Sequence, residues 1–332
     1  MTSDRPLAGT QGESCVTTPS QSGMRIVVLG AAAGGGFPQW NCNCPGCRRS
    51  RRNDGAVRSR TQASLAISTD NKRWTLLNAS PDLPYQLRTS AMLYPASTGG
   101  IRNSPISAAV VSSGDVDCIA GLLSLRESQP FVIYADDFVR DIIEGNQIFR
   151  VLDRRLVTLS PLPAGPAIDL HDAEGVPLGL SVEAFPVTGK IPLYQETSDD
   201  IQQLTSEKAV IGLSISGPRN KRIVYIPGCA SITDDLLRRI ENADVLFFDG
   251  TLWEDDEMIR AGTGRKSGKR MGHISISGED GSIAALAGAR LGKKVFIHIN
   301  NTNPILCDDS PQAAAVREAG WGIAYDGMEL SL

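Results

Sequence analysis

Short apolar runs separated by polar turns dominate the first half of the chain, a pattern typical of strands joined by loops. The pattern predicts strands at 24–36, where a β-branched run ends in a glycine-rich turn, and at 62–69, 73–80, 106–113 and 131–135. The polar turn between the second and third strands predicts a β-hairpin. Residues 81–88 are predicted to form a loop that enters a helix, and helices are predicted at 121–128 and at 136–145, where apolar residues recur three and four positions apart.

The second half repeats this alternation of strands and helices. Strands are predicted at 180–187, 209–216, 222–228, 244–250 and 294–300, and helices at 233–243, 282–292 and 310–320. The segment 322–330 predicts a last hairpin. Because strands and helices alternate twice with no long linker, residues 24–332 are expected to form a single α/β domain, a four-layer αββα sandwich with helices outside two sheets.

Composition narrows the class of protein. The 332 residues carry a net charge of −4, so nothing in the charge favours nucleic acid or an anionic membrane as a partner. No stretch reaches the ~20 apolar residues needed to cross a bilayer. Residues 1–23 are polar and lack the apolar segment of a secretory signal, so we expect a disordered lead and a cytoplasmic protein with reduced thiols.

Three of the seven cysteines lie within the stretch NCNCPGC, at Cys42, Cys44 and Cys47. Three thiols cannot pair among themselves, and reducing conditions oppose a disulfide. The spacing, with Pro45 and Gly46 in a tight turn, favours three thiolates around one tetrahedral Zn²⁺, whose fourth ligand must come from elsewhere. Buried thiols and a redox role stay open as alternatives.

A second group of candidate residues follows the buried strand at 106–113. Asp115 and Asp117 lie two positions apart, and Cys118 comes next. Both carboxylates are candidate metal ligands, and capping of the following helix is the alternative role for them. Two residues far along the chain, His273 and His298, stand at the ends of predicted elements and are expected to face this acidic turn.

Asp249 completes the candidate set, because it follows the apolar strand at 244–250 and precedes a glycine. Its carboxylate is expected to emerge at the edge of the sheet, beside the histidines.

Eight motifs in order resemble the coenzyme PQQ synthesis protein B family, from 24 to the C-terminus. They are LGAAAGGGFPQWNCNCPGC, RTQASLAIS, LLNASPDL, GLLSLRE, VYIPGC, FDGTLW with DDEMIRAG, MGHISISG and HINNTNPIL. The resemblance implies a metallo-β-lactamase-like fold and a role in making pyrroloquinoline quinone (PQQ). It implies Fe²⁺- and O₂-dependent hydroxylation of the tyrosine ring in a peptide-derived glutamate–tyrosine precursor.

The resemblance also assigns site residues. It implies an active-site metal on Asp115, Asp117, Cys118 and His298, with Asp249 and His273 as further ligands or proton-handling groups. At position 118 the family normally has histidine, so Cys118 is a departure that puts turnover in question. For the zinc on the cysteines, relatives place the fourth ligand three residues after the distal histidine, which is Asn301 here.

Two other functions stay open beside the oxygenase. One is a non-catalytic carrier that transports PQQ or its precursor to the periplasm, and the other is a hydrolase with altered ligands. The expected partners are the dipeptide precursor, other PQQ-pathway proteins and a second copy of the chain in a homodimer. Nucleic acid and membrane insertion are not expected.

Overall fold

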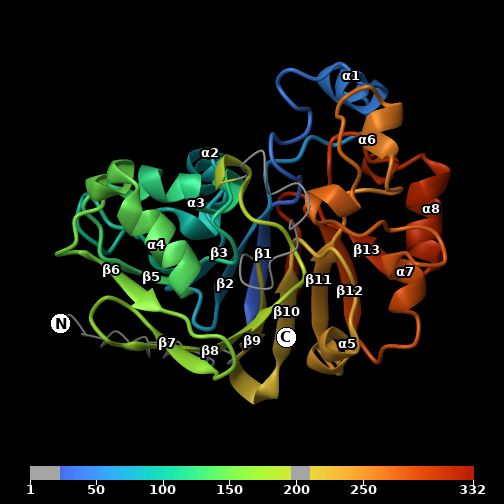
Figure 1. The fold of residues 1–332 in the computed structure, drawn as a ribbon. Coiled ribbons are helices and arrows are strands. Elements are labelled where there is room, and N and C mark those ends of the chain that lie inside the picture. Colours follow the sequence, from blue (N-terminus) through green and yellow to red (C-terminus); the bar gives the residue numbers. More distant parts are fainter. Residues whose placement is uncertain (1–22, 196–209) are drawn as a thin grey trace, which may run out of the picture.

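The computed structural model describes residues 23–195 and 210–332, and these form two seven-stranded sheets with helices on their outer faces (Figure 1). The lead predicted to be disordered lies almost entirely outside the described residues. The first sheet has the order β14-β1-β2-β3-β4-β5-β6 and the second the order β13-β12-β11-β10-β9-β8-β7. The four-layer αββα sandwich predicted from the sequence is therefore confirmed.

The first sheet consists of β1 (Arg25–Gly30), β2 (Ser64–Ser68), β3 (Trp74–Leu77), β4 (Ile106–Val110), β5 (Phe131–Ala135), β6 (Val157–Pro161) and β14 (Glu329–Ser331). The second consists of β7 (Ile168–His171), β8 (Pro177–Pro186), β9 (Ile211–Ser216), β10 (Arg222–Ile226), β11 (Val245–Asp249), β12 (Lys293–Ile297) and β13 (Trp321–Ile323). The α-helices are α1 (Pro45–Arg51), α2 (Leu83–Thr89), α3 (Val116–Ile119), α4 (Asp137–Gly145), α5 (Asp234–Ile240), α6 (Glu257–Arg260), α7 (Ser282–Ala285) and α8 (Pro311–Glu318). None of the described helices is long and apolar enough to cross a membrane.

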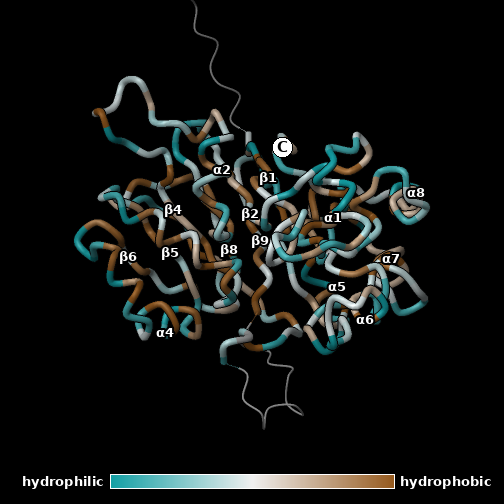
Figure 2. The backbone as a smooth tube through the Cα atoms, turned by 90° about the horizontal axis from the view of Figure 1, so that it is seen from above, coloured by the Kyte–Doolittle hydropathy of each residue, from teal (hydrophilic) through white to brown (hydrophobic). Residues whose placement is uncertain are grey.

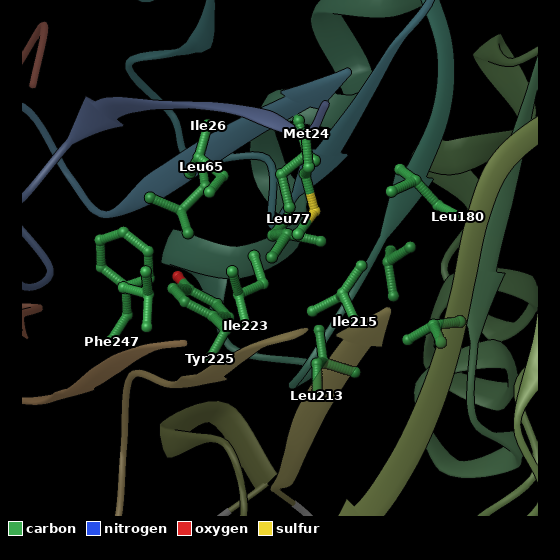
Figure 3. Close-up of a cluster of buried hydrophobic side chains, with 14 of the residues drawn as sticks. Met24, Ile26, Leu65, Leu77, Leu180, Leu213, Ile215, Ile223, Tyr225 and Phe247 are labelled. Carbon is green, nitrogen blue, oxygen red and sulfur yellow. The ribbon is translucent and has the colours of Figure 1, made fainter. Parts of the chain in front are cut away.

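The alternation of side chains along each strand explains the layers. In β10, Ile223 and Tyr225 point into the cluster between the sheets, while Val224 and Ile226 join a second cluster under α5 and α8. A third cluster lies between the first sheet and α2 and α4. Figure 3 shows the central cluster, where Tyr225 and its neighbours from the second sheet meet side chains of the first.

Burial of these three clusters is the main force that holds the layers together. Seen from above, the strands are brown and the surface loops largely teal, so the apolar residues follow the sheets (Figure 2). Because most strand residues on both sheets are buried on both faces, the periphery and the loops at the strand ends are left for chemistry.

The predicted hairpin is confirmed, because β2 and β3 pair antiparallel. Thr233 caps α5 by accepting a hydrogen bond from the Leu236 N–H. Ser310 caps α8 in the same way, through the Ala313 N–H.

Other local predictions are wrong. The hairpin predicted at 322–330 does not exist, because β13 pairs with β12 in one sheet and β14 pairs with β1 in the other. The helix predicted at 282–292 ends as a regular α-helix at Ala285. β6 and β7 were not predicted, and both have several exposed or half-buried positions that weaken the apolar signal.

Candidate functional site: a carboxylate and histidine group beside a cavity

The ends of three strands and one short 3₁₀ turn converge beside a cavity of about 420 Å³. Asp115 and Asp117 come after β4, at the start of α3, and His298 directly follows β12. Asp249 ends β11, and His273 follows a short 3₁₀ turn. In parallel strands the carboxyl ends meet at one edge, so residues far apart in sequence reach one place.

The two histidines and Asp249 form what we call the cavity group. Their ligand atoms all lie within 4.8 Å of one another. The imidazole rings stack with centroids 5.3 Å apart. His273 Nδ1 lies 2.8 Å from Asp249 Oδ2, and the Asp249 side chain is fully buried. Such a buried carboxylate requires several donors to be stable.

Those donors surround Asp249. Its carboxylate accepts hydrogen bonds from the Cys229 N–H at 2.9 Å, the Thr251 N–H at 3.0 Å and the Thr251 hydroxyl at 2.6 Å. The Thr251 Oγ1 also lies 3.1 Å from His273 Nδ1 and 2.9 Å from His298 Nδ1. Thr251 therefore connects all three members of the cavity group, although it was not predicted as a site residue. The only feature of the sequence that could have pointed to Thr251 is its place in the family motif FDGTLW, two residues after Asp249.

Asp117 and His298 meet across the cavity floor, 181 positions apart in sequence. His298 Nε2 lies 2.9 Å from Asp117 Oδ2, so the predicted convergence of an early carboxylate and a late imidazole is seen in the structure. Burial is the largest influence on the pKa of His298 and lowers it, but the hydrogen bond and charge of Asp117, with the charges of Asp249 and Asp115, together leave that pKa raised. Burial is likewise the largest influence on the pKa of Asp117 and raises it, but the hydrogen bond and charge of His298, with a backbone hydrogen bond and the charge of His273, together leave that pKa lowered.

His298 adopts a left-handed backbone conformation, with a φ of +59°. Outside glycine and asparagine this conformation is uncommon and costs about 1 kcal/mol or more, so it marks a residue held in place by its surroundings. The bonds to Asp117 and Thr251 on both ring nitrogens supply that restraint.

Asp115 lines the cavity but bonds elsewhere. Its Oδ2 accepts a hydrogen bond from the Ser113 hydroxyl at 2.9 Å. It occupies the N-cap position of α3, yet its side chain caps no backbone N–H, so the capping role considered for it is not seen. Burial, followed by the charge of Asp117, raises the pKa of Asp115.

Cys118 also lines the cavity and is 7% exposed, since it belongs to the apolar cluster under α2 and α4. Burial, with the charges of Asp117 and Asp115, raises the pKa of its thiol well above the usual value. Among the residues that the structure describes, Asp115, Asp117, Cys118 and His298 do not form a group with all ligand atoms within 4.8 Å, whereas Asp249, His273 and His298 do.

The cysteines form a separate group, which we call the cysteine cluster: Cys42, Cys44 and Cys47. Their sulfurs lie within 4.8 Å of one another, and Cys44 is the N-cap residue of α1, a helix that was not predicted. The Asn301 side chain lies against them, with Nδ2 3.0 Å from the Cys42 sulfur and 3.5 Å from that of Cys47. The structure thus brings Asn301 to the cluster, as predicted.

Comparison with known proteins identifies the family. The chain matches the beta-lactamase superfamily domain over residues 73–299. It is 47% identical to coenzyme PQQ synthesis protein B of Gluconacetobacter diazotrophicus over 307 residues, 92% of this chain and 99% of that protein. It is 48% identical to the Xanthomonas campestris pv. campestris protein of the same name over 310 residues. This chain belongs to the coenzyme PQQ synthesis protein B family.

Solved structures agree with this assignment. The crystal structure of Zn²⁺-bound PqqB from Methylobacterium extorquens has a TM-score of 0.86 and 46% identity, and covers 93% of this chain and all of that one. A diphosphatase of the PhnP family has a TM-score of 0.62 at 20% identity and shows the shared fold alone. The family recognised from eight sequence motifs is thus confirmed.

Proposed function

We propose that this protein acts in PQQ biosynthesis as a metal-dependent oxygenase that hydroxylates the tyrosine ring of a peptide-derived glutamate–tyrosine precursor. The names of its relatives support the pathway. The observation that carries the proposal for the chemistry is the cavity group, in which the ligand atoms of one carboxylate and two imidazoles lie within 4.8 Å of one another and both imidazoles line a cavity. Two histidines and one carboxylate with open positions are the ligand set of many non-haem Fe(II) oxygenases.

The residues present fit a divalent metal. Asp249, His273 and His298 offer mixed oxygen and nitrogen donors, and Asp117 adds a carboxylate 2.9 Å from His298. Imidazole suits both iron and zinc, so the donor set alone does not choose between them. Bound Fe²⁺ would supply the binding and activation of O₂, which Zn²⁺, having no redox chemistry, does not supply.

The protein's own residues hold this arrangement in place. The Thr251 hydroxyl contacts Nδ1 of both His273 and His298 and thereby orients the two rings. A hydrogen-bond partner on one ring nitrogen sets which tautomer an imidazole adopts and which nitrogen faces a metal. The cavity also has apolar wall residues, including Val116, Met258 and Met271, which suit an aromatic ring and exclude water from it.

The proposal is tested with protein loaded with Fe²⁺ without oxygen, then given ¹⁸O₂, a glutamate–tyrosine dipeptide and ascorbate, a reductant that supplies the two electrons needed to convert the second oxygen atom to water. We expect a dipeptide product that carries one added ¹⁸O atom by mass spectrometry. Absence of an oxygen-dependent product from protein verified to hold iron would reject the oxygenase. Binding of the precursor without turnover would favour the carrier, and cleavage of generic phosphodiesters without oxygen would favour the hydrolase.

Replacing His298 with alanine gives a sharper version of this test. Loss of this ligand is expected to reduce iron content and to lower turnover at least about 100-fold. His171→Ala is the matched control, because His171 lies in β7, its Nδ1 contacts the Asp169 carbonyl, and it does not line the cavity. Equal activity of the two variants would contradict the proposed site.

A further inference from the structure

The cavity that we assign to the glutamate–tyrosine precursor carries an excess of negative charge. Asp115 and Asp117 line it, and Asp249 lies directly behind Thr251. A glutamate–tyrosine dipeptide is itself acidic, because its side-chain and C-terminal carboxylates outnumber its one N-terminal ammonium group. Like charges in a partly buried site repel strongly, so an acidic ligand needs a fixed cation in addition to any bound metal.

Lys190 is the one lysine or arginine among the described residues that line this cavity. It lies close enough to Asp115 for the two charges to attract each other. Its ammonium group is a compact charge on a flexible stem, which suits a carboxylate that arrives with a ligand.

The segment that carries Lys190 packs closely against two glycines, Gly272 at one end and Gly114 at the other. A Cβ atom at Gly272, whose φ is +83°, would lie 3.1 Å from the Lys190 backbone nitrogen and 3.2 Å from its Cγ. Gly272 immediately precedes His273, so Lys190 lies directly beside the cavity group. Only glycine combines this backbone conformation with such a close approach.

The other end of the segment is held beside the acidic turn. The Tyr194 hydroxyl donates a hydrogen bond to the Gly114 carbonyl at 2.7 Å. A Cβ at Gly114 would lie 3.4 Å from the Tyr194 Oη and 3.5 Å from Pro192 Cγ. The segment 190–194 therefore forms a fixed wall between the turn that carries Asp115 and the loop that carries His273.

We propose that Lys190 binds a carboxylate of the substrate and makes this site selective for acidic, tyrosine-containing dipeptides. The inference rests on the proposed function and deepens it, because it states how the precursor is selected. One lysine set among three aspartates suits a carboxylate and opposes a phosphate, whose higher charge would need more cations. The apolar wall residues Val116, Met258 and Met271 then receive the ring.

The test measures binding to Zn²⁺-loaded protein without oxygen, by calorimetry, so that turnover plays no part. The ligands are Glu-Tyr, Gln-Tyr and the C-terminal amide of each. Wild-type protein is expected to bind Glu-Tyr about 10- to 100-fold more tightly than the analogue that lacks the recognised carboxylate, as befits one charge-assisted hydrogen bond. Lys190→Ala should abolish this preference, and the amide series identifies which carboxylate is recognised.

Lys269→Ala is the matched control, because it removes an exposed lysine that lies three residues from Gly272 and does not line the cavity. It should keep the full preference. Gly272→Ala should weaken the preference by displacing Lys190 while its charge remains. If Lys190→Ala keeps the preference of the wild type for Glu-Tyr, the inference is wrong while the proposed function stands. If wild-type protein binds none of the dipeptides, the proposed substrate fails and the inference fails with it.

Discussion

Two groups of side chains in this protein could each hold a metal ion, the cavity group and the cysteine cluster. His298 of the first and Asn301 beside the second lie three positions apart in the sequence, yet the two groups differ in their donor atoms and in their access to a cavity. The cavity group offers carboxylate and imidazole donors beside an open space. The cysteine cluster offers thiols and an amide, and Cys47 is fully buried. Thiolates favour zinc, whereas mixed oxygen and nitrogen donors accept several divalent metals.

The difference teaches what each group is suited to do. Cys42 and Cys44 pack against the apolar cluster of the second sheet, and Asn301 closes the remaining side. A metal ion held by these three thiolates and a fourth donor would have no position left for a substrate, which is the mark of a structural metal. The cavity group keeps one side open to ligands, which is the mark of a reactive one.

Loss of the cysteine cluster is expected to have the largest effect on stability. The cluster ties the loop around α1 to the segment after β12, so we expect Cys44→Ser to lose one metal equivalent per chain. Structural Zn²⁺ contributes binding energy directly to folding, so we expect the free energy of unfolding to fall by about 5 kcal/mol or more. Metal analysis and denaturant unfolding measure both effects.

Cys307→Ser is the control for this experiment, since Cys307 is a free thiol outside the cluster. It should keep both the metal and the stability. If Cys44→Ser keeps its metal content and stability while Asp249→Asn loses metal, the assignment of the structural metal to the cysteines is wrong.

The same contrast separates what the sequence could predict from what it could not. The cysteine cluster is local, since its three thiols lie within six positions, and its spacing alone predicted a metal. The pairing of Asp117 with His298 spans 181 positions and was predicted through family motifs. The central role of Thr251 depends on how three loops meet in space, which no local pattern encodes.

The predicted final hairpin failed for a related reason. The turn between β13 and β14 has the composition of a hairpin, but each strand finds a better partner in a different sheet. Tertiary packing overrides local strand preference in such cases. The αββα architecture, by contrast, depends on the whole alternation of strands and helices and was predicted correctly.

A second prediction concerns Glu257, whose carboxylate is hydrogen-bonded to Thr302, directly after Asn301. It accepts hydrogen bonds from the Thr302 hydroxyl at 2.6 Å and the Trp253 N–H at 2.7 Å. Burial raises the pKa of Glu257 to about 7. Between its ordinary pKa of 4.5 and about 7, the folded state keeps a proton that the unfolded state releases.

Stability should therefore fall as pH rises through this range, by about 3 kcal/mol at most. Glu257→Gln should remove that part of the pH dependence and be more stable than wild type at pH about 8. Glu254→Gln, which makes the same charge change at a half-buried glutamate paired with Arg260, is the control. Denaturant unfolding at several pH values measures the slopes, and identical slopes for Glu257→Gln and wild type would contradict the prediction.

The smallest expected effect concerns Cys118, the position at which the resemblance to the family led us to expect histidine. The thiol lines the cavity but lies outside the cavity group, so we expect Cys118→Ser to leave metal affinity within about 2-fold of wild type. Cys118→His adds an imidazole facing Asp117 and is expected to raise metal affinity about 10-fold. Because the side chain is 7% exposed, the larger ring should also cost about 1–3 kcal/mol of stability.

Titration with Co²⁺ of protein whose cysteine cluster already holds Zn²⁺ tests whether the Cys118 thiol is a ligand. A thiolate that binds Co²⁺ gives an intense near-ultraviolet absorption band. Such a band in the wild type, lost in Cys118→Ser, would show that the thiol is a ligand after all. The contrast between sulfur donors in one group and oxygen and nitrogen donors in the other would then no longer hold.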